Sequence, residues 1–496
     1  MIDALAVLCL VFVLLGMVPT VATLAQFLLV GLHGIRNHYP KCADHTPRVA
    51  FILPAWNEAD VLGASIDSLM TMDYPAGAWR LYIVDDASTD HTPEVMREKM
   101  AQYPGSVFHL RRAKGGQGKA HTLNHGIREI LAETWAEAVM IMDADVLFEP
   151  LTLRRMTRHL ADPEVGGVTA YVKEGSEPAS LLSRFIAFEY ITAQAAARRA
   201  QNVAGGIPCM AGGAQLHSRE NLIAIGGAID TSTLAEDTYT TIKTQLGGRL
   251  ALFDPNAIVW AEEPDSVVAL WKQRLRWGRG NLQITLAFRD LWFRPSRNAQ
   301  FGNLAFGVLW FSIALMPVFM ILGSAGLIGL FYLWPSWTPL AFSILWGITF
   351  ISFLFQTLFA FAIDPQAAGR SWFAGIAFPG LLSLGIMLLA VLGLRPFTGL
   401  AIHWPAPGGW PLGEIGGEIG AVVILGWSAL STLAAWGVYR LDKAGAPKWL
   451  RNILLVLVGY GPLLCAISLG AIIGQLRSAD LKWDKTIKSG KARLPP

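Results

Sequence analysis

Charged residues are scarce in this chain and nearly balanced in sign. They make up 16% of its 496 residues, and the formal net charge is only +3. So small an excess gives no strongly basic surface for a polyanion, and nucleic acid is therefore excluded as an expected partner. Hydrophobic residues make up 53% of the chain, which indicates that part of it lies in a membrane.

Cysteine is also rare. The four cysteines, Cys9, Cys42, Cys209 and Cys465, are scattered through the chain. They show no metal-binding spacing and no disulfide framework. We interpret them as small buried hydrophobic residues in a reducing cytosol.

The apolar excess falls in two regions, residues 1–31 and 301–474, whose runs reach the length of about 20 residues that spans a bilayer. The first run follows Asp3 and precedes Arg36, so its charge pattern fits an anchor with a cytoplasmic carboxyl end better than a signal peptide. We expect four parts: a transmembrane anchor (1–44), a cytoplasmic domain (45–298), transmembrane helices (299–445), and interfacial helices with a cytoplasmic tail (446–496).

Within the cytoplasmic domain, strand-like and helix-like segments alternate. Strands are expected at 48–54, 79–84, 106–111 and 139–142, and helices at 59–70, capped by Asn57, at 92–100 and at 120–132. This alternation predicts a parallel, doubly wound α/β sheet. Polar residues at the carboxyl ends of such strands share one ligand-binding crevice.

The strand at 139–142 ends in Asp143 and Asp145. Two carboxylates one residue apart are oxygen ligands of the kind that Mg²⁺ or Mn²⁺ uses to bridge a protein to phosphates. Alone, Asp-x-Asp is a weak signal and could be a solvated turn.

A glycine-rich segment at 114–119 lacks the Walker spacing and could be a flexible turn. Its position before the Asp-x-Asp strand favours a role for Lys119 near a diphosphate. Gly212 and Gly213 allow either close approach of a ligand or tight packing. Glu236 and Asp237 open a helix that runs to 246, where an acid is also favoured by the helix dipole alone.

The segment 271–280 places Gln273, Arg276 and Trp277 on one face of a helix. An arginine binds phosphate oxygens bidentately, and an indole stacks on a sugar. A basic helix resting on anionic lipid headgroups is the alternative.

Together these segments resemble the inverting, membrane-embedded family 2 glycosyltransferases, which include cellulose, chitin, hyaluronan and poly-N-acetylglucosamine synthases. The resemblance covers residues 48–280 and rests on Pro54-x-x-Asn57-Glu58, Asp85-Asp86, Asp143-x-Asp145, Glu236-Asp237 and Gln273-Arg274-x-Arg276-Trp277. It implies a GT-A (Rossmann-like) domain inserted in an α-helical membrane protein, a UDP-sugar donor and Mg²⁺ or Mn²⁺. The tail Trp483-x-x-Thr486-x-Lys488 resembles the gating segments of these synthases.

The resemblance also implies a role for each matching residue. Asp237 is the expected general base, with Glu236 beside it, and Asp143 and Asp145 are the expected metal ligands. Trp277, Gly212 and Gly213 would bind the acceptor, and Trp483, Thr486 and Lys488 would gate the site. The expected donor-binding residues are Pro54, Glu58, Asp85, Asp86, Lys119, Asp143, Gln273, Arg274 and Arg276.

Three functions are compatible with these sequence features. The first is a processive synthase that extends a β-linked polysaccharide and exports it; the second is an enzyme adding one sugar to a lipid; the third is a non-catalytic scaffold. The intact set of aspartates argues against the scaffold, and the helices after the domain favour the synthase. Its expected partners are the UDP-sugar, the growing glycan, membrane lipids and accessory export proteins, and its expected location is the bacterial inner membrane.

The topology has one further feature. Residues 450–474 are apolar enough to cross, yet Gly459–Pro462 interrupts them and a basic tail follows. We predict that 450–478 forms broken interfacial helices on the cytoplasmic face, leaving one amino-terminal crossing and four later ones.

Overall fold

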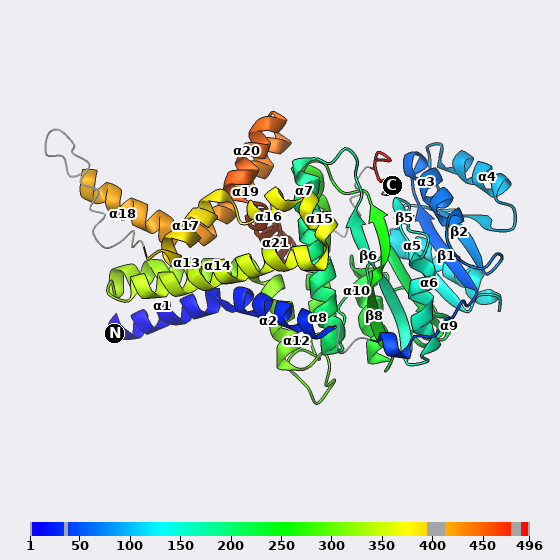
Figure 1. Cartoon of the computed structure of the whole chain (residues 1–496), viewed down its shortest axis with the longest axis horizontal. Coiled ribbons are helices and arrows are strands. Elements are labelled where there is room, and N and C mark those ends of the chain that lie inside the picture. Colours follow the sequence, from blue (N-terminus) through cyan, green and yellow to red (C-terminus); the bar gives the residue numbers. More distant parts are fainter. Residues whose placement is uncertain (1, 34–37, 394–411, 478–487, 495–496) are drawn as a thin grey trace. The chain divides into compact units, whose positions relative to one another are not determined.

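The structure, a computed structural model, describes residues 2–33, 38–393, 412–477 and 488–494 (Figure 1). Contacts divide the chain into two compact units. We call them the helical unit (1–27, 266–279 and 304–479) and the sheet unit (28–265, 280–303 and 480–496). Residues 266–279, which hold most of the Gln-Arg-x-Arg-Trp helix, therefore group with the membrane-type helices.

The sheet unit is built on eight strands in the order β3-β2-β1-β4-β7-β6-β8-β5. The first four are parallel; β7 runs antiparallel to β4 and β6, β8 is parallel to β6, and β5 is antiparallel to β8. The bounds are β1 Val49–Ala55, β2 Trp79–Asp85, β3 Val107–Arg111, β4 Ala138–Met142, β5 Val146–Phe148, β6 Val165–Glu174, β7 Ala214–Ser218 and β8 Leu250–Ala261.

The predicted α/β fold class and its four parallel strands are confirmed, but the expectation of a wholly parallel sheet is wrong. The second half is mixed, and its long strands β6 and β8 were not predicted. Gly166 and Gly167 weaken the strand signal of β6. In β8 the Asp254-Pro255-Asn256 segment interrupts the alternation, where the register between the two strands shifts.

Helices in the sheet unit follow the predicted segments closely where predictions were made. They are α3 Ala59–Met70, α4 Thr92–Gln102, α5 Lys119–Ala132, α6 Thr152–Thr157, α7 Leu181–Glu189, α8 Ala197–Ala204, α9 Arg219–Ala224 and α10 Glu236–Leu246, with the short 3-10 turns η1 Tyr39–Lys41 and η2 Arg158–Ala161 and the π-helix η3 Tyr190–Ala196. The predicted cap Asn57 is wrong, because Glu58 occupies the cap position. Asn57 has a φ of 55°, and its Oδ1 instead accepts a hydrogen bond from Thr89 N.

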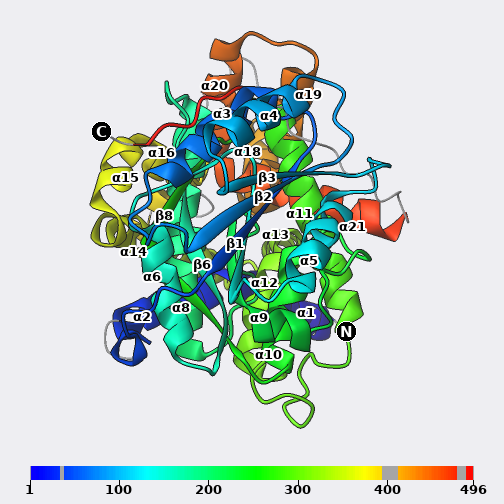
Figure 2. The same cartoon turned by 90° about the vertical axis from the view of Figure 1, so that its right-hand side faces the viewer.

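One face of the parallel half is covered by α5 (Figure 2). Its side chains Leu123, Ile127 and Ile130 pack on Ile52 of β1 and Ile141 of β4, and all five are at most 2% exposed. Strands β1 and β4 read as continuous apolar runs because both of their faces are buried. This packing fixes the start of α5, where Lys119 lies, against the end of β4.

The helical unit contains most of the apolar helices. They are α1 Ile2–Gly16, α2 Val18–His33 (whose last residues group with the sheet unit), α11 Val267–Ala287 up to residue 279, α12 Leu304–Ala314, α13 Met316–Leu333, α14 Thr338–Ile363, α15 Pro365–Arg370, α16 Trp372–Ile376, α17 Leu381–Val391, α18 Leu412–Leu425, α19 Trp427–Lys443, α20 Lys448–Val458 and α21 Tyr460–Leu476. Residues 2–33, 316–333 and 338–363 are long and apolar enough to cross a membrane.

Several apolar runs within the region 301–474 are divided into shorter helices. The run 301–332 breaks at Leu315, before Pro317 in the first turn of α13. The run 372–394 contains α16 and then α17, whose 11 residues fall short of a bilayer span. The predicted interruption near Gly459 is confirmed, since α20 and α21 meet there at 91°, and α18 and α19 meet at 79°.

Glycines bring α1 and α13 close together. A Cβ on Gly326 would lie 2.5 Å from the carbonyl oxygen of Cys9, and a Cβ on Gly16 would lie 2.7 Å from the Cα of Gly323. Small residues at such positions let membrane helices pack backbone to backbone.

Candidate active site

Asp143 and Asp145 lie in the turn between β4 and β5. The Ser65 hydroxyl donates to the Ala144 carbonyl at 2.6 Å, and Val146 N donates to the Asp143 carbonyl at 3.3 Å. The first bond holds the turn to α3, and the second closes the turn itself. The Asp143 side chain is 39% exposed and that of Asp145 14% exposed, so both carboxylates remain accessible at the end of a fully buried strand.

Lys119 joins three of the predicted site residues. Its Nζ lies 2.5 Å from Asp143 Oδ1 and 3.7 Å from Glu236 Oε1. Burial opposes the charge on this ammonium, but Asp143, Glu236 and Asp237 outweigh burial and raise the pKa of Lys119 above its ordinary value. The lysine is therefore a fixed positive charge between the Asp-x-Asp turn and the start of α10.

Asp237 faces a loop whose nearest residue, Gly212, has no side chain. Gly212 N donates to Asp237 Oδ2 at 3.3 Å, and Thr238 N donates to Asp237 Oδ1 at 2.7 Å. A Cβ on Gly212 would lie 2.9 Å from Lys119 Nζ, so glycine leaves the space between lysine and aspartate open. A Cβ on Gly213 would lie 3.8 Å from Asp143 Oδ2.

Two threonines that the sequence did not single out hold this loop. Thr241 Oγ1 accepts from Met210 N at 2.8 Å and donates to the Asp237 carbonyl at 2.7 Å. Thr169 Oγ1 accepts from Ala211 N at 3.0 Å and donates to the Ala214 carbonyl at 3.1 Å. A signal was present in α10, where four threonines occupy an 11-residue helix although threonine is a poor helix former.

Asp85 and Asp86 shape the neighbouring loops. Asp85 is fully buried, pairs with Arg111 at 2.9 Å and accepts from Ser88 N at 2.7 Å. Asp86 pairs with Arg112 and accepts from Gly116 N at 2.9 Å. The carboxylate of Asp86 thus holds the glycine-rich loop, and Arg112 is a partner that the sequence did not reveal. Nucleobase binding by these aspartates stays a prediction.

Pro54 and Glu58 lie beside these loops. Pro54 pairs in register with Val84, and Glu58 N donates to Thr92 Oγ1 at 2.8 Å. Both therefore lie near the carboxyl ends of β1 and β2, where the resemblance places donor-binding residues.

The tail reaches the Asp-x-Asp turn. Lys488 Nζ lies 2.7 Å from Asp145 Oδ2 and also donates to the Glu262 carbonyl. Burial opposes the ammonium charge, but Asp145, Glu263 and Glu262 raise the pKa of Lys488 above its ordinary value. The other predicted gating residues, Trp483 and Thr486, lie outside the described residues.

Glu262 anchors the residues that follow Lys488. Its carboxylate accepts from Ser489 N at 2.8 Å, from Ser489 Oγ at 2.9 Å and from Lys491 N at 2.8 Å. Ala492 then forms an antiparallel bridge with Ser176. The sequence did not single out Glu262.

The Gln-Arg-x-Arg-Trp motif lies in the helical unit. Gln273 Oε1 accepts from Arg274 Nη1 at 2.8 Å, and the Arg274 guanidinium lies 4.0 Å from the Trp277 ring centroid. One turn earlier, Trp271 stacks on Tyr439 of α19 at 4.1 Å. The roles of Gln273, Arg274, Arg276 and Trp277 in binding donor and acceptor stay predictions.

A parallel half-sheet that ends in Asp-x-Asp, extended by a mixed half-sheet, defines a GT-A glycosyltransferase fold. Residues 47–280 match the family model described as "Glycosyltransferase like family 2". Residues 47–280 therefore form a family 2 glycosyltransferase domain, and the protein is an enzyme that transfers a sugar.

Three curated proteins illustrate its relatives. The chain is 27% identical to the probable glycosyltransferase YdaM of Bacillus subtilis, over 73% of this chain and 87% of that protein. It is 32% identical to the beta-monoglucosyldiacylglycerol synthase of Synechocystis sp., over 50% of each. It is 26% identical to the poly-beta-1,6-N-acetyl-D-glucosamine synthase of Staphylococcus epidermidis, over 64% of this chain and 75% of that protein.

Among solved structures, mannosyltransferase PcManGT from Pyrobaculum calidifontis, in complex with GDP-Man and Mn2+, is 22% identical, with a TM-score of 0.46 over 84% of this chain and 99% of that chain.

Proposed function

We propose that this protein transfers a sugar from a UDP-sugar, with inversion, to a growing β-linked polysaccharide and exports the product through its membrane helices. The observation that carries the transfer is the cluster of Asp143, Lys119 and Asp237 around the open space at Gly212. It combines a place for a diphosphate with a carboxylate that can take a proton.

In this proposal Asp237 is the general base. The acceptor oxygen attacks the anomeric carbon, its proton passes to Asp237 Oδ2, and the bond from that carbon to the UDP oxygen breaks. Asp237 Oδ1 already accepts from Thr238 N, so Oδ2 is the oxygen that turns toward the Gly212 loop. A positioned base contributes about 10²–10⁴-fold to such a rate.

The residues of the Asp-x-Asp turn fit a divalent cation. Asp143 and Asp145 supply hard oxygen ligands, and each already lies within 2.7 Å of an ammonium group, so the turn attracts positive charge. We assign Asp143 and Asp145 as the residues that would hold Mg²⁺ or Mn²⁺. The ion would neutralise the leaving diphosphate, and Lys119 would contact the same group after leaving Asp143.

Donor and acceptor binding by the remaining residues follows from the family resemblance. Asp86, with Asp85 behind it, is assigned to the nucleobase, Gln273 and Arg276 to the diphosphate, and Trp277 with the Gly212–Gly213 loop to the acceptor. Lys488, together with Trp483 and Thr486, is assigned to gating.

Processive synthesis is supported by the helical unit. Helices α13 and α14 and two bent pairs follow the catalytic domain, and each is apolar enough to cross or enter a membrane. A bacterial inner membrane, with the sheet unit in the cytoplasm, fits this arrangement. A second function, addition of one sugar to a lipid, is favoured by the identity of 32% to a glucosyldiacylglycerol synthase.

The size of the product separates the two functions. Purified protein in detergent would receive a panel of UDP-sugars with Mg²⁺ or Mn²⁺, and UDP release and product length would be measured together. We expect one donor to support UDP release and chains much longer than one sugar at low enzyme concentration. A single added sugar per lipid molecule would refute processivity and establish the second function.

A further inference from the structure

A cluster of metal-ligand side chains lies apart from the carboxylate site, in the sheet unit. His38, Cys42 and His159 each offer one ligand atom, and these atoms lie within 4.8 Å of one another. Cys42 Sγ is 3.1 Å from His159 Nδ1. The side chains of His38 and His159 are only 10% and 2% exposed. One thiol and two imidazoles are typical ligands of zinc.

The spacing of the three atoms suits a small tetrahedral ion. With zinc–sulfur and zinc–nitrogen distances of about 2.3 and 2.0 Å, neighbouring ligand atoms lie about 3.5 Å apart. Cys42 and His159 are already near that separation. His38 and Cys42 flank the short turn η1, so a small adjustment of this turn brings the His38 ring into range.

His159 is oriented as a metal ligand is. Its Nε2 lies 2.9 Å from Asp254 Oδ2, which leaves Nδ1 directed at Cys42. Asp254 is itself fully buried and accepts from the Tyr39 hydroxyl at 2.7 Å. A carboxylate behind the second ring nitrogen is the usual outer partner of a histidine that binds a metal.

Asp162 is the candidate for a fourth ligand, and it lies just outside the group of three. Among the side chains that the structure describes, His38 Nε2 and Asp162 Oδ2 are two enclosed atoms that receive no hydrogen bond, and Lys41 Nζ forms an ion pair with Asp162 Oδ2 at 3.4 Å. His38 Nε2 and Asp162 Oδ2 lie 3.7 Å apart, and Asp162 is the third residue after His159. An ion between them would give the imidazole nitrogen a partner and would take the place of Lys41 beside the carboxylate.

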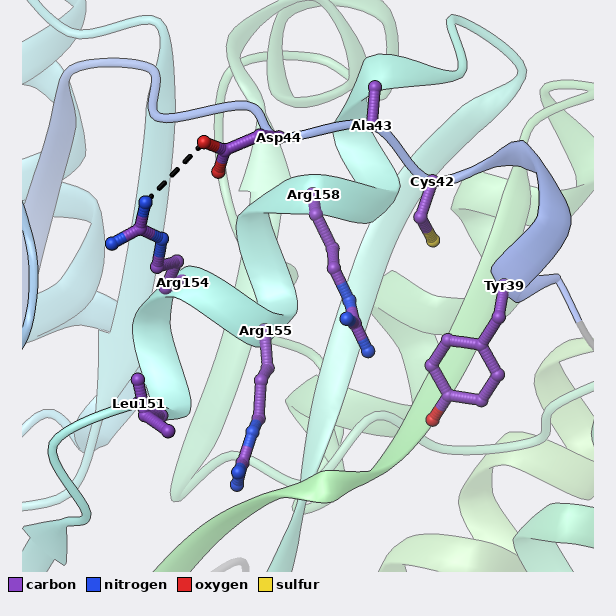
Figure 3. Close-up of a pocket in the computed structure, with 8 residues that line it drawn as sticks. All are labelled: Tyr39, Cys42, Ala43, Asp44, Leu151, Arg154, Arg155 and Arg158. Carbon is purple, nitrogen blue, oxygen red and sulfur yellow. Dashed lines mark hydrogen bonds and ion pairs between the residues drawn. The ribbon is translucent and has the colours of Figure 1, made fainter.

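The cluster can be reached from solvent. Cys42 lines a cavity of about 410 Å³, and in Figure 3 its sulfur points toward the space between Tyr39 and Arg158. The cavity also contains Arg154 and Arg155, but Arg154 pairs with Asp44 at 3.4 Å and Arg158 lies 3.5 Å from Asp254. Carboxylates thus pair with two of the three arginines along the entry path, and Arg155 donates to the Asn256 carbonyl.

We propose that His38, Cys42 and His159, with Asp162 as the fourth ligand, bind one Zn²⁺ ion. The ion connects the segment between α2 and β1 to η2. His159 of η2 in turn contacts Asp254 of β8. The role of the ion is structural, because four protein ligands close the coordination sphere.

Cobalt binding tests this site without using activity. Full-length protein in detergent, stripped with a chelator, would be titrated with Co²⁺, whose bond to a thiolate gives a charge-transfer absorption in the near ultraviolet. Cobalt on the Asp-x-Asp turn gives no such band. We expect the band in the wild type at about one ion per chain, its loss in Cys42→Ser, and displacement by Zn²⁺.

Cys209→Ser is the matched control. Cys209 lies in the same unit as Cys42, but it is beside Asp237 and does not belong to the proposed zinc cluster. This variant should keep the band. His38→Gln and Asp254→Asn keep the thiol and should weaken cobalt affinity, the latter by about 10–100-fold. No band in the wild type, a band that survives in Cys42→Ser, or unchanged affinity in His38→Gln would each overturn the proposal.

Discussion

At the scale of single residues, the site depends on a balance of charges around Lys119. Asp143, Glu236 and Asp237 surround one ammonium group, and this arrangement holds three carboxylates near one another. A nucleotide diphosphate brings negative charge to the same place, so donor and divalent metal are expected to enter together.

The first prediction concerns the general base. Asp237→Asn keeps the size of the side chain and removes its ability to take a proton. We expect turnover to fall by about 10²–10⁴-fold while UDP binding survives. Asp145→Asn is the comparison, since it should weaken UDP binding that depends on metal. Near-normal transfer by Asp237→Asn would show that another group is the base.

The second prediction concerns Gly115. A Cβ at this position would lie 2.0 Å from the Asp86 carbonyl oxygen, so Gly115→Ala must move the glycine-rich loop away from Asp86. We expect a KM for the UDP-sugar raised at least several-fold, with the fold retained. Gly63→Ala is the control, because its nearest neighbour is the flexible end of Lys99 at 3.6 Å. Equal KM values in the two variants would show that the loop does not contribute to donor binding.

Sequence reasoning reached these residues unevenly. Asp143, Lys119, Glu236, Asp237, Gly212 and Gly213 were predicted and lie together, because strand ends and helix starts can be placed from local patterns. The partner of Asp145 could not be predicted, since Lys488 is distant in the chain and only folding brings it near. His159 was missed for the same reason, and Cys42 consequently showed no metal-binding spacing.

At the scale of elements, all four parallel strands were predicted. Continuous apolar runs made β1 and β4 the clearest, since strands buried on both faces leave a clear signal, whereas the edge strand β3 is only partly buried. Strands β6 and β8 were hidden by Gly166, Gly167 and Pro255. They form because each pairs with its neighbours over many residues, which is a tertiary effect that outweighs local propensity.

The tail segment 488–494 is an element that the sheet unit holds in place. Because Glu262 accepts three hydrogen bonds from it, Glu262→Ala should release the segment. We expect trypsin to cleave after Lys488 and Lys491 several-fold faster than in the wild type, measured by mass spectrometry. Glu133→Ala, which removes only a surface pair with Arg80, should leave the rate unchanged. Equal cleavage of both variants would refute this anchoring.

The contact between α1 and α13 gives a prediction about stability. Gly326→Ala places a methyl group 2.5 Å from the Cys9 carbonyl, so the helices must separate. We expect a lower Tm for the protein in detergent. Gly347→Ala on α14 has no atom within 4 Å of the new Cβ and should leave Tm unchanged or higher. A Tm for Gly326→Ala that matches Gly347→Ala would contradict the packing.

At the scale of the whole molecule, the position of the tail constrains the topology. Ala492 pairs with Ser176 of the sheet unit, so both must lie on the same side of a membrane. If residues 304–477 cross it, they do so an even number of times. Our expectation of four later crossings satisfies this condition. A second set of four crossings also satisfies it. In that set α13, α14, the pair α18 and α19, and the pair α20 and α21 each cross once, and the short α17 does not cross. Sequence reasoning could not choose between these, because hydropathy does not report where a helix bends.

The central claim is that transfer and export occur in one chain. It is tested most directly in sealed proteoliposomes with the sheet unit facing outward, supplied with labelled UDP-sugar and divalent metal from outside only. We predict long labelled chains that stay with washed vesicles and are released only by detergent, and none with Asp237→Asn. Labelled product that is limited to single sugars on lipid, or that washes away from intact vesicles, would contradict the account.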